Sequence, residues 1–195
     1  MARRSDHTRE ELATLIVAEG HAQMEAVGFA RFSAREVAKR IGYSIGTLFN
    51  VFCNVDRLVL AINARTLDLW TAHLDAALAE GGADRTDCLV RSYFSFAEEH
   101  RHSWAAIYDH RLPAGESPPD WYAEALDRLI GRVVAEVEAV LPPARAAEAP
   151  ALARSLLATV HGHCVFAMNG TFALLGEGAP LEAALARVRE GLARA

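Results

Sequence analysis

Histidine and cysteine are the residues in this sequence best suited to bind a metal, and their spacing argues against a metal site. The chain holds eight histidines and three cysteines. His100 and His102, like His161 and His163, are two residues apart, which on a helix points the rings about 200° apart. His161 and Cys164 are three apart and could share a helix face, but two ligands do not make a site. We therefore expect no metal and no cofactor.

Signatures of common enzyme classes are also missing. The sequence has no nucleophile elbow, phosphate-binding P-loop, zinc-protease helix or dinucleotide-binding glycine fingerprint. Cys53, Cys88 and Cys164 are widely separated and odd in number, which is typical of a reducing cytoplasm. The polar N-terminus lacks a secretory signal. Polar residues interrupt the apolar stretch 158–175, which fits a buried helix better than a membrane span. We expect a cytoplasmic protein that is not an enzyme.

Helix signals dominate the chain and strand signals are nearly missing, which predicts an all-α fold of about nine helices. Side chains suited to capping open four helices in the first third of the chain: Thr8 with Glu11, Ser33 with Glu36, Ser44, and Asn54. Glycines end three of these helices, at Gly28, Gly42 and Gly81. The remaining helices are expected over 84–100, 104–111, 147–175 and 180–194, with one more that is opened by Ser117-Pro118-Pro119-Asp120 and ends before Pro142.

The stretch 28–58 has the pattern of a helix-turn-helix, in which a turn of three or four residues joins two short helices. Gly42 can adopt the left-handed conformation that ends the first helix, and Ala38 is small where the helices approach. An apolar face spans both helices: Val37, Ile41, Leu48 and Phe52. The outer face of the second helix is left with short, mostly polar residues: Ser44, Ile45, Thr47 and Asn50. Such a helix fits a DNA major groove about 12 Å wide.

These residues resemble the N-terminal pattern of the tetracycline-repressor (TetR) family of transcriptional regulators. The matching positions follow one another without a gap: Gly28-Phe29, Ser33, Val37-Ala38, Ile41-Gly42, Ser44, Gly46-Thr47-Leu48, Phe52, Asn54, Asp56 and Leu58. The resemblance implies a three-helix DNA-binding head, residues 1–53, joined to a ligand-binding and dimerisation bundle, residues 54–195. The step 160–162 also resembles the His-Gly of a subgroup named for a Trp-His-Gly signature, without its tryptophan.

The resemblance also implies which residues touch DNA. Ser33 and Thr47 would donate hydrogen bonds to phosphates, and the backbone amides of the helix opened by Ser44 would face phosphate as well. Arg35 is a candidate base or phosphate contact. The residues expected to lie toward base edges are Tyr43, Ile45 and Asn50.

Two positions depart from the family pattern, and both departures predict weaker or less salt-dependent DNA binding. Phe49 stands where the family usually has a tyrosine whose hydroxyl reaches phosphate, and Val55 stands where it usually has a lysine. Each missing phosphate contact lowers the salt slope by roughly one. Arg57 could replace the lost charge or be a solvated surface residue. The N-terminal arginines Arg3, Arg4 and Arg9 could touch phosphates or form a solvated basic tail.

The charge distribution is a weak argument for nucleic-acid binding, whereas the apolar C-terminal segments indicate where the chain dimerises. Residues 1–52 carry seven Lys and Arg against six Asp and Glu, whereas residues 53–195 carry thirteen against nineteen. One recognition helix gives little contact area, so such domains usually dimerise and read half-sites about 34–36 Å apart. The segment 147–176 is apolar on nearly every face of its second half, and 180–194 carries an apolar stripe. We expect these two segments to form a homodimer.

The ligand site is less well defined by sequence. The family resemblance places a cavity among the fourth to eighth helices, where aromatic residues and histidines crowd. Candidate ligand contacts are Trp70, Tyr93, Trp104, Tyr108, His110, Trp121, His161 and Phe166. For His161 the alternative is a buried ring satisfied by a neighbouring carbonyl, and for the aromatic residues it is the ordinary core. We expect a small apolar or aromatic ligand.

The sequence therefore predicts a regulator, resembling the TetR family, that binds double-stranded operator DNA as a homodimer. The family implies a repressor that its ligand releases from DNA. The alternative is a helical small-molecule-binding or metal-binding protein without DNA binding, and neither reading requires a membrane.

Overall fold

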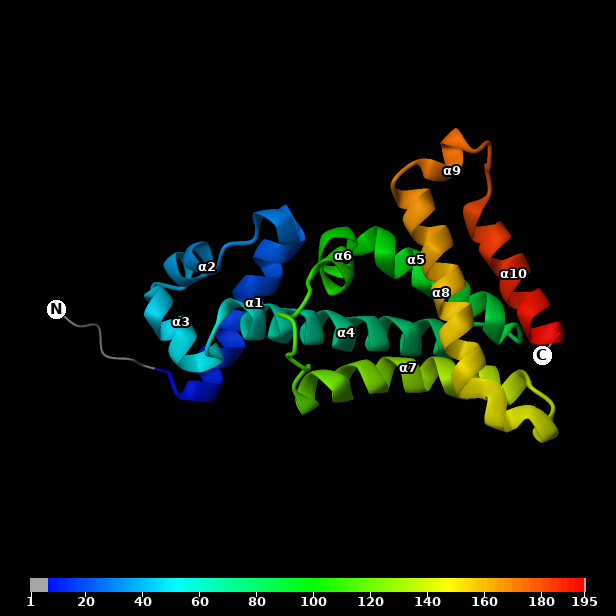
Figure 1. Cartoon of the computed structure of the whole chain (residues 1–195), viewed down its shortest axis with the longest axis horizontal. Helices are drawn as coiled ribbons and strands as arrows, with labels where there is room; N and C mark the ends of the chain where they lie inside the picture. Colours follow the sequence, from blue (N-terminus) through cyan, green and yellow to red (C-terminus); the bar gives the residue numbers. More distant parts are fainter. Residues whose placement is uncertain (1–6, 195) are drawn as a thin grey trace. The chain divides into compact units, whose positions relative to one another are not determined.

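The computed structural model describes residues 7–194, which contain ten α-helices, two short 3-10 helices and no strand. The helices follow one another as α1 Arg9–Val27, α2 Ala34–Arg40, α3 Ile45–Phe52, α4 Val55–Glu80, α5 Arg85–Glu99, α6 Arg101–Asp109, α7 Asp120–Val140, α8 Ala149–Met168, α9 Thr171–Leu174 and α10 Pro180–Arg194 (Figure 1). The 3-10 helices are η1 Phe29–Arg31 and η2 Pro143–Glu148. The predicted all-α fold is confirmed. Arg3 and Arg4 lie outside the described residues.

The chain divides into two compact units. Unit 1 contains Met1–Asp68 and His100–Ala125, and unit 2 contains Leu69–Glu99 and Leu126–Ala195. Helices α4 and α7 each begin in unit 1 and end in unit 2. The chain also passes directly from α5 of unit 2 into α6 of unit 1, with His100 as the single residue between the two helices.

The core of unit 1 is built by apolar residues of α1, α2, α3, α4 and α6. Ile16, Met24, Val37, Leu48 and Ile62 are completely buried in it. Full burial of a side chain of this size stabilises the fold by about 1.5–3 kcal/mol. Gly20 is needed at its position on α1, since an added Cβ would lie 2.6 Å from the Ile62 side chain.

Most of the predicted helix starts are confirmed, but at Ser33 only one of the two hydrogen bonds of the predicted capping box forms. Thr8 and Glu11 form the reciprocal capping box, and the Ser44 and Asn54 side chains accept from backbone amides three residues ahead. The Ser33 hydroxyl also accepts from the amide of residue 36. The reciprocal bond predicted from Glu36 is wrong, because the Ser33 amide donates to the Gln23 side chain of α1 instead. A tertiary contact here replaces a local one.

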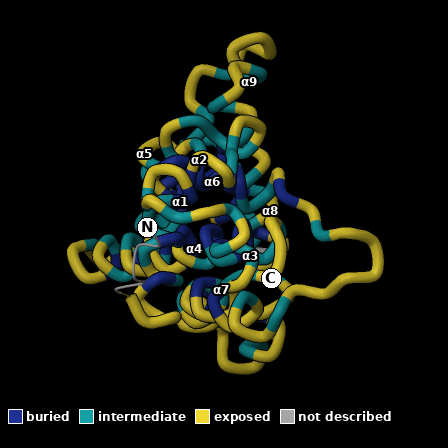
Figure 2. Tube along the Cα trace, turned by 90° about the vertical axis from the view of Figure 1, so that its left-hand side faces the viewer, coloured by how far each residue is buried: buried dark blue, intermediate teal, exposed yellow. Residues whose placement is uncertain are grey.

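The long helix predicted over 147–175 is wrong at both ends. A 3-10 turn precedes α8, and α8 ends at Met168. Gly170 then adopts a left-handed conformation, with φ of 78°, which a helix cannot continue through. The short α9 follows and is largely exposed, as Figure 2 shows. The final helix opens at Pro180 as predicted.

Unit 2 is centred on α8, which packs against α10, α9, η2 and α5. Gly191 on α10 lets the two long helices approach, because a Cβ there would lie 2.7 Å from the Leu156 side chain. Ion pairs add to the packing: Arg85 with Glu136, Arg91 with Glu182, and Arg189 with Asp84. The Arg85 pair is bidentate, with nitrogen–oxygen distances of 2.7 and 2.8 Å.

In the part of the chain that the structure describes, no single helix is long and apolar enough to cross a membrane. Helices α3 and α4 meet the length and composition criteria only as a pair, and a bend of 71° separates them.

Candidate DNA-binding surface and ligand site

Helices α2 and α3 form a tight helix-turn-helix in unit 1. Helix α2 ends at Arg40, and Gly42 has a φ of 76°, the left-handed conformation expected from the sequence. The Tyr43 amide donates to the Ala38 carbonyl at 2.9 Å and closes the turn. Ser44 then caps α3, and its hydroxyl accepts from the Thr47 amide at 3.2 Å. Gly42, Tyr43 and Ser44 thus fix the direction in which α3 leaves the turn.

The inner face of this motif follows the sequence pattern. Val37, Ala38 and Leu48 are at most 2% exposed, while Ile41 and Phe52 are partly buried and pack against the same core. Removing a fully buried leucine from such a site costs about 2–5 kcal/mol. The position of α3 on unit 1 is therefore set by packing rather than by the turn alone.

The outer face is less exposed than the sequence pattern predicts. Ser44 and Asn50 are exposed as expected, and Arg35 is exposed at the start of α2. Ile45, expected on the open face, is half-buried and packs against the core of unit 1. Tyr43, placed toward base edges by the family resemblance, also packs there.

The hydroxyls proposed to reach phosphate are held by neighbours. Thr47 is half-buried, and its hydroxyl lies 3.0 Å from the Ser44 hydroxyl. Ser33 is half-buried at the start of α2, where its side chain caps the helix. Phe49 is half-buried on α3. A hydroxyl both donates and accepts, so capping leaves these groups able to bind a further partner.

The first described residues fasten both ends of α3, a feature that sequence reasoning missed. His7 Nδ1 lies 3.0 Å from the Tyr43 hydroxyl, just before α3. Arg9 Nη2 lies 3.5 Å from the carbonyl oxygens of Asn50 and Val51, in the last turn of α3. Helix α3 has no basic residue of its own in that turn, so Arg9 supplies the positive charge that stabilises a helix C-terminus. No local sequence signal links residues this far apart.

The corner between α3 and α4 is a strained γ-turn at Cys53. Its φ of 69° makes Cys53 the single non-glycine residue with positive φ in the described chain. The Asn54 amide donates to the Phe52 carbonyl at 2.8 Å, which closes a three-residue turn. This γ-turn conformation is rare and strained for an L-residue.

Three of the predicted ligand residues come together in an aromatic cluster of unit 2. Trp70 on α4 lies between Tyr93 and Phe96 on α5, with ring centroids 4.9 and 5.0 Å away. The Tyr93 hydroxyl lies 2.8 Å from His161 Nδ1 on α8. Burial lowers the pKa of His161 below its ordinary value. The side-chain partner of His161 is thus a hydroxyl, where the sequence left open a carbonyl or a ligand.

The structure gives the other five predicted ligand residues further contacts or exposed positions. Trp104 and Tyr108 form their own ring pair in unit 1, with centroids 5.3 Å apart. His110 lies 3.0 Å from an Asp56 carboxylate oxygen in unit 1. Trp121 on α7 and Phe166 on α8 are both 42% exposed. The aromatic residues that crowd the sequence are therefore distributed over several packing sites.

Within the described residues, histidine, cysteine, aspartate and glutamate side chains form no group of three or more that could hold a metal ion. The closest approach of such groups is at Glu25 of α1, which lies near His21 and His100. The i,i+4 spacing of His21 and Glu25 is visible in the sequence. The contact of Glu25 with His100 is not visible in the sequence, because 75 positions separate the two residues.

Comparisons with solved structures agree with the helical architecture. A protein of unknown function from Rhodococcus sp. RHA1 superimposes with a TM-score of 0.70 at 24% identity and covers 100% of this chain and 98% of its own. The multidrug binding protein EbrR, solved with imidazole, superimposes with a TM-score of 0.63 at 20% identity, covering 95% and 96% of the two chains. At these identities the likeness is one of fold.

Sequence relatives lead to the family. The HTH-type transcriptional regulator Rv1816 of Mycobacterium tuberculosis is 25% identical over 127 residues, which are 63% of this chain and 54% of that protein. The chain thus spans about half the length of the curated relatives it matches. Residues 86–190 match the model of the tetracyclin repressor-like C-terminal domain, a span of more than half the chain. This chain belongs to the tetracyclin repressor-like family.

Proposed function

We propose that this chain is a transcriptional regulator that binds operator DNA through α2 and α3. The observation that carries the proposal is the tight turn from Ala38 to Ser44, which buries Leu48 and leaves Ser44 and Asn50 exposed on α3. A short helix held in this way can enter a major groove with its N-terminal residues toward base edges. The family membership and the regulators among its relatives support the same function.

Two substitutions on α3 test this surface. Thr47→Ala is expected to weaken binding to all sequences alike, because a phosphate contact carries no sequence information. Asn50→Ala is expected to relax the preference at one base position, at a cost of about 1–3 kcal/mol for the preferred base. Fluorescence anisotropy with operator and scrambled duplexes at two salt concentrations measures both effects. Thr14→Ala on the exposed side of α1 is the matched control, and equal binding by all variants would refute the surface.

The proposed regulator acts as a homodimer through α8 and α10. Ala158, Gly162 and Phe166 are exposed on α8 at four-residue intervals and form an uncharged face. A Cβ built on Gly162 meets no atom within 4 Å. A partner helix can therefore approach this face closely, and two-fold assembly brings two copies of the same face together.

Gly162 allows a clean test of this dimer. Gly162→Arg has room in one protomer, and replacing a helical glycine favours the helix by up to about 1 kcal/mol, so the substitution should break only the dimer. Gly131→Arg on α7 is the matched control, since Gly131 is also helical, exposed and without neighbours within 4 Å. Light scattering after size-exclusion chromatography should show a monomer for Gly162→Arg alone. Dimers of both variants would exclude this face.

The proposed regulator also responds to a small apolar ligand, with the aromatic cluster around Trp70 and Tyr93 as the binding region. Flat ring faces and one neutral Tyr93–His161 pair favour an uncharged or aromatic molecule. The structural neighbour EbrR is a multidrug binding protein. Helix α4 begins directly after α3 and continues to Trp70, so a ligand that tilts α4 changes the spacing of the two heads in the dimer. To release most of the DNA, the ligand must prefer the released state by several kcal/mol.

Binding of an aromatic probe tests this response. A panel of neutral, anionic and cationic aromatic compounds is screened by thermal shift, and each hit is added to the anisotropy assay with operator DNA. We expect neutral compounds to stabilise the protein and lower DNA affinity, consistent with a repressor that its ligand releases. Trp70→Leu should abolish the response, while Trp121→Leu, which removes an exposed ring, should retain it. Equal DNA binding by saturated and empty protein would exclude the switch.

A further inference from the structure

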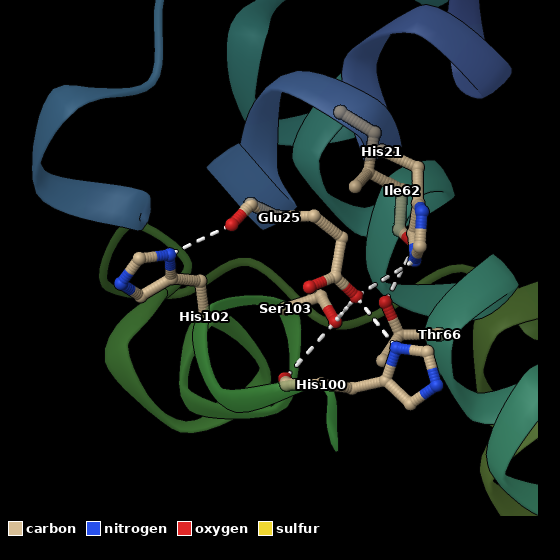
Figure 3. A network of polar contacts seen from close by, with 7 residues as sticks. All are labelled: His21, Glu25, Ile62, Thr66, His100, His102 and Ser103. Atoms are coloured by element: carbon tan, nitrogen blue, oxygen red, sulfur yellow. Dashed lines mark hydrogen bonds and ion pairs between the residues drawn. The ribbon is translucent and has the colours of Figure 1, made fainter. Parts of the chain in front are cut away.

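A partly buried cluster of polar side chains joins α1 to α6 inside unit 1. It contains His21 and Glu25 on α1, His100 just before α6, and His102 and Ser103 on α6 (Figure 3). We call these five residues the Glu25 cluster. Neither of the proposed binding events uses it.

One carboxylate oxygen holds the cluster together. The Ser103 hydroxyl donates to Glu25 Oε1 at 2.5 Å, and His100 Nδ1 lies 2.8 Å from the same oxygen. The His102 Nδ1–H donates a hydrogen bond to the Glu25 backbone carbonyl at 2.7 Å. Three polar contacts, from His100, His102 and Ser103, therefore meet one residue of α1, and hydrogen bonds to a charged group are the stronger kind.

His21 is the member of the cluster whose position is not settled by a hydrogen bond. It is 8% exposed, and its Nε2 atom is buried without a hydrogen-bond partner. The nearest acceptor is again Glu25 Oε1, at 3.9 Å. That oxygen already serves Ser103 and His100 on the other helix. A protonated His21 would therefore compete with Ser103 and His100 for Glu25 Oε1.

Burial is the main reason why His21 resists a proton. Burial lowers the pKa of His21 most strongly, Glu25 opposes this effect, and Arg65 of α4 and His100 add to it. His102 brings a third imidazole to the same junction. The carboxylate of Glu25 thus lies among three imidazoles of the cluster, and the guanidinium of Arg65 adds a further positive charge.

We propose that the Glu25 cluster is an acid-sensitive latch between α1 and α6, with His21 as its switch. With His21 neutral, Glu25 Oε1 binds Ser103 and His100 and holds α6 to α1. With His21 protonated, the buried cation draws the same carboxylate toward its own helix, where the two side chains are one helical turn apart. The contacts to α6 weaken, and the end of α6 that follows His100 is released.

The direction of the pH effect follows from proton linkage. The closed latch holds His21 in a buried place that resists a proton, whereas an opened latch exposes the ring to water and restores its ordinary pKa of 6.5. The ratio of closed to open states is therefore highest above pH 6.5 and decreases as the pH falls below 6.5. The ratio of closed to open changes by up to about tenfold per pH unit for one linked proton.

The latch acts at the point where the chain passes between the two units. His100 is the residue between α5 and α6, and α5 carries Tyr93 and Phe96 of the aromatic cluster. Opening the latch frees α6 from α1, the helix whose first residue also contacts the end of α3. The consequence for DNA affinity rests on the proposed function, whereas the latch itself does not.

Hydrogen exchange measures the latch without DNA. Exchange of the α6 amides is followed by mass spectrometry between pH 7.5 and pH 5.5 and corrected for the intrinsic rate of the free peptide. The wild-type protein should lose protection of α6 by about tenfold over this range, while the α10 amides of unit 2 keep theirs. His21→Gln should keep α6 protected at both pH values, and His21→Leu provides the same test if the amide disturbs packing. His163→Gln, a half-buried histidine of α8, is the matched control and should behave as wild type.

Two results would overturn the latch. One is an α6 protection that does not change with pH in the wild-type protein, and the other is a pH profile that His21→Gln and His21→Leu both retain. Operator affinity measured over the same pH range then reports on the coupling. If α6 opens in acid as expected and no DNA binds at any pH, the latch stands and the proposed regulator fails.

Discussion

Three of the histidines in unit 1 lie near a carboxylate, whereas the histidines of unit 2 are bound to hydroxyl or carbonyl oxygens. In unit 1, His21 and His100 lie near the Glu25 carboxylate, and His110 lies near Asp56. In unit 2, His73 is bound to the Ser95 hydroxyl, His161 to the Tyr93 hydroxyl, and His163 to a backbone carbonyl. A histidine beside a carboxylate gains an ion pair when it takes a proton, whereas one beside a hydroxyl gains little and loses hydration. Protonation of these three unit 1 histidines is thus coupled to a carboxylate, whereas the unit 2 histidines lie against uncharged groups.

The cysteines of the two units give the largest predicted effect, which is a difference in their rates of alkylation. Burial, with a smaller contribution from Glu98, raises the pKa of Cys164 in unit 2 to about 12, while Cys53 in unit 1 is exposed. The thiolate is the reactive form, so native Cys164 should react with iodoacetamide at least about a thousandfold more slowly than Cys53 at pH 8. Peptide mass spectrometry over time gives both rates. Comparable rates in the native protein would show that unit 2 opens to water.

Glu25→Gln tests the carboxylate at the centre of unit 1. The amide cannot serve the Ser103 hydroxyl and His100 as a charged acceptor, so we expect a loss of about 1–3 kcal/mol in the free energy of unfolding at pH 7.5. Urea unfolding followed by circular dichroism measures the change. Glu10→Gln, at an exposed position of the same helix, should stay within about 0.5 kcal/mol of wild type. If the two variants lose equal stability, the Glu25 cluster is an ordinary surface network.

Tyr93→Phe tests the neutral pair of unit 2. Removing one hydrogen bond between uncharged groups should cost about 1 kcal/mol, and the loss should not depend on salt. Because burial lowers the pKa of His161, the folded state resists protonation and stability falls as the pH drops below 6.5. His161→Gln should reduce that acid-induced loss. A strong salt dependence of the Tyr93→Phe effect would show that the Tyr93–His161 pair is charged and weaken the contrast.

The strained corner at Cys53 gives the smallest predicted effect, and it acts on unit 1 alone. Glycine adopts positive φ without the steric cost that cysteine has, so Cys53→Gly should raise the free energy of unfolding by about 0.5–1 kcal/mol, after the greater flexibility of the unfolded chain is counted. Thermal unfolding measures the gain. Cys53→Ala keeps the Cβ and should show no such gain, which separates relief of backbone strain from loss of the thiol.

Local signals predicted most of the fold, because helix ends depend on residues that are neighbours in the chain. The Thr8–Glu11 box, the caps at Ser44 and Asn54 and the turn at Gly42 were all visible as short patterns. The break at Gly170 was missed because apolar residues continue beyond it and a single glycine inside a helical pattern is often tolerated. In the structure its left-handed conformation ends α8.

The candidate sites could be predicted only where the motif is compact. The helix-turn-helix occupies one stretch, so spacing alone places its inner face. The ligand residues are spread over almost one hundred positions, from Trp70 to Phe166, and hydrophobicity does not tell which aromatic rings meet. Trp70 stacks on Phe96 at an interplanar angle of 3°, whereas Trp104 pairs with Tyr108. The contacts of Glu25 with His100 and Ser103 join residues 75 and 78 positions apart, and no local pattern encodes them.

The placement of the three tryptophans gives the molecule intrinsic optical reporters. Trp70 is stacked on Phe96 inside unit 2, Trp104 is buried on α6 in unit 1, and Trp121 faces solvent. Variants that keep one indole at a time would emit from one known environment each, blue-shifted for the two buried rings and red-shifted for the third. A change in emission could then be attributed to one unit in real time and without an attached dye.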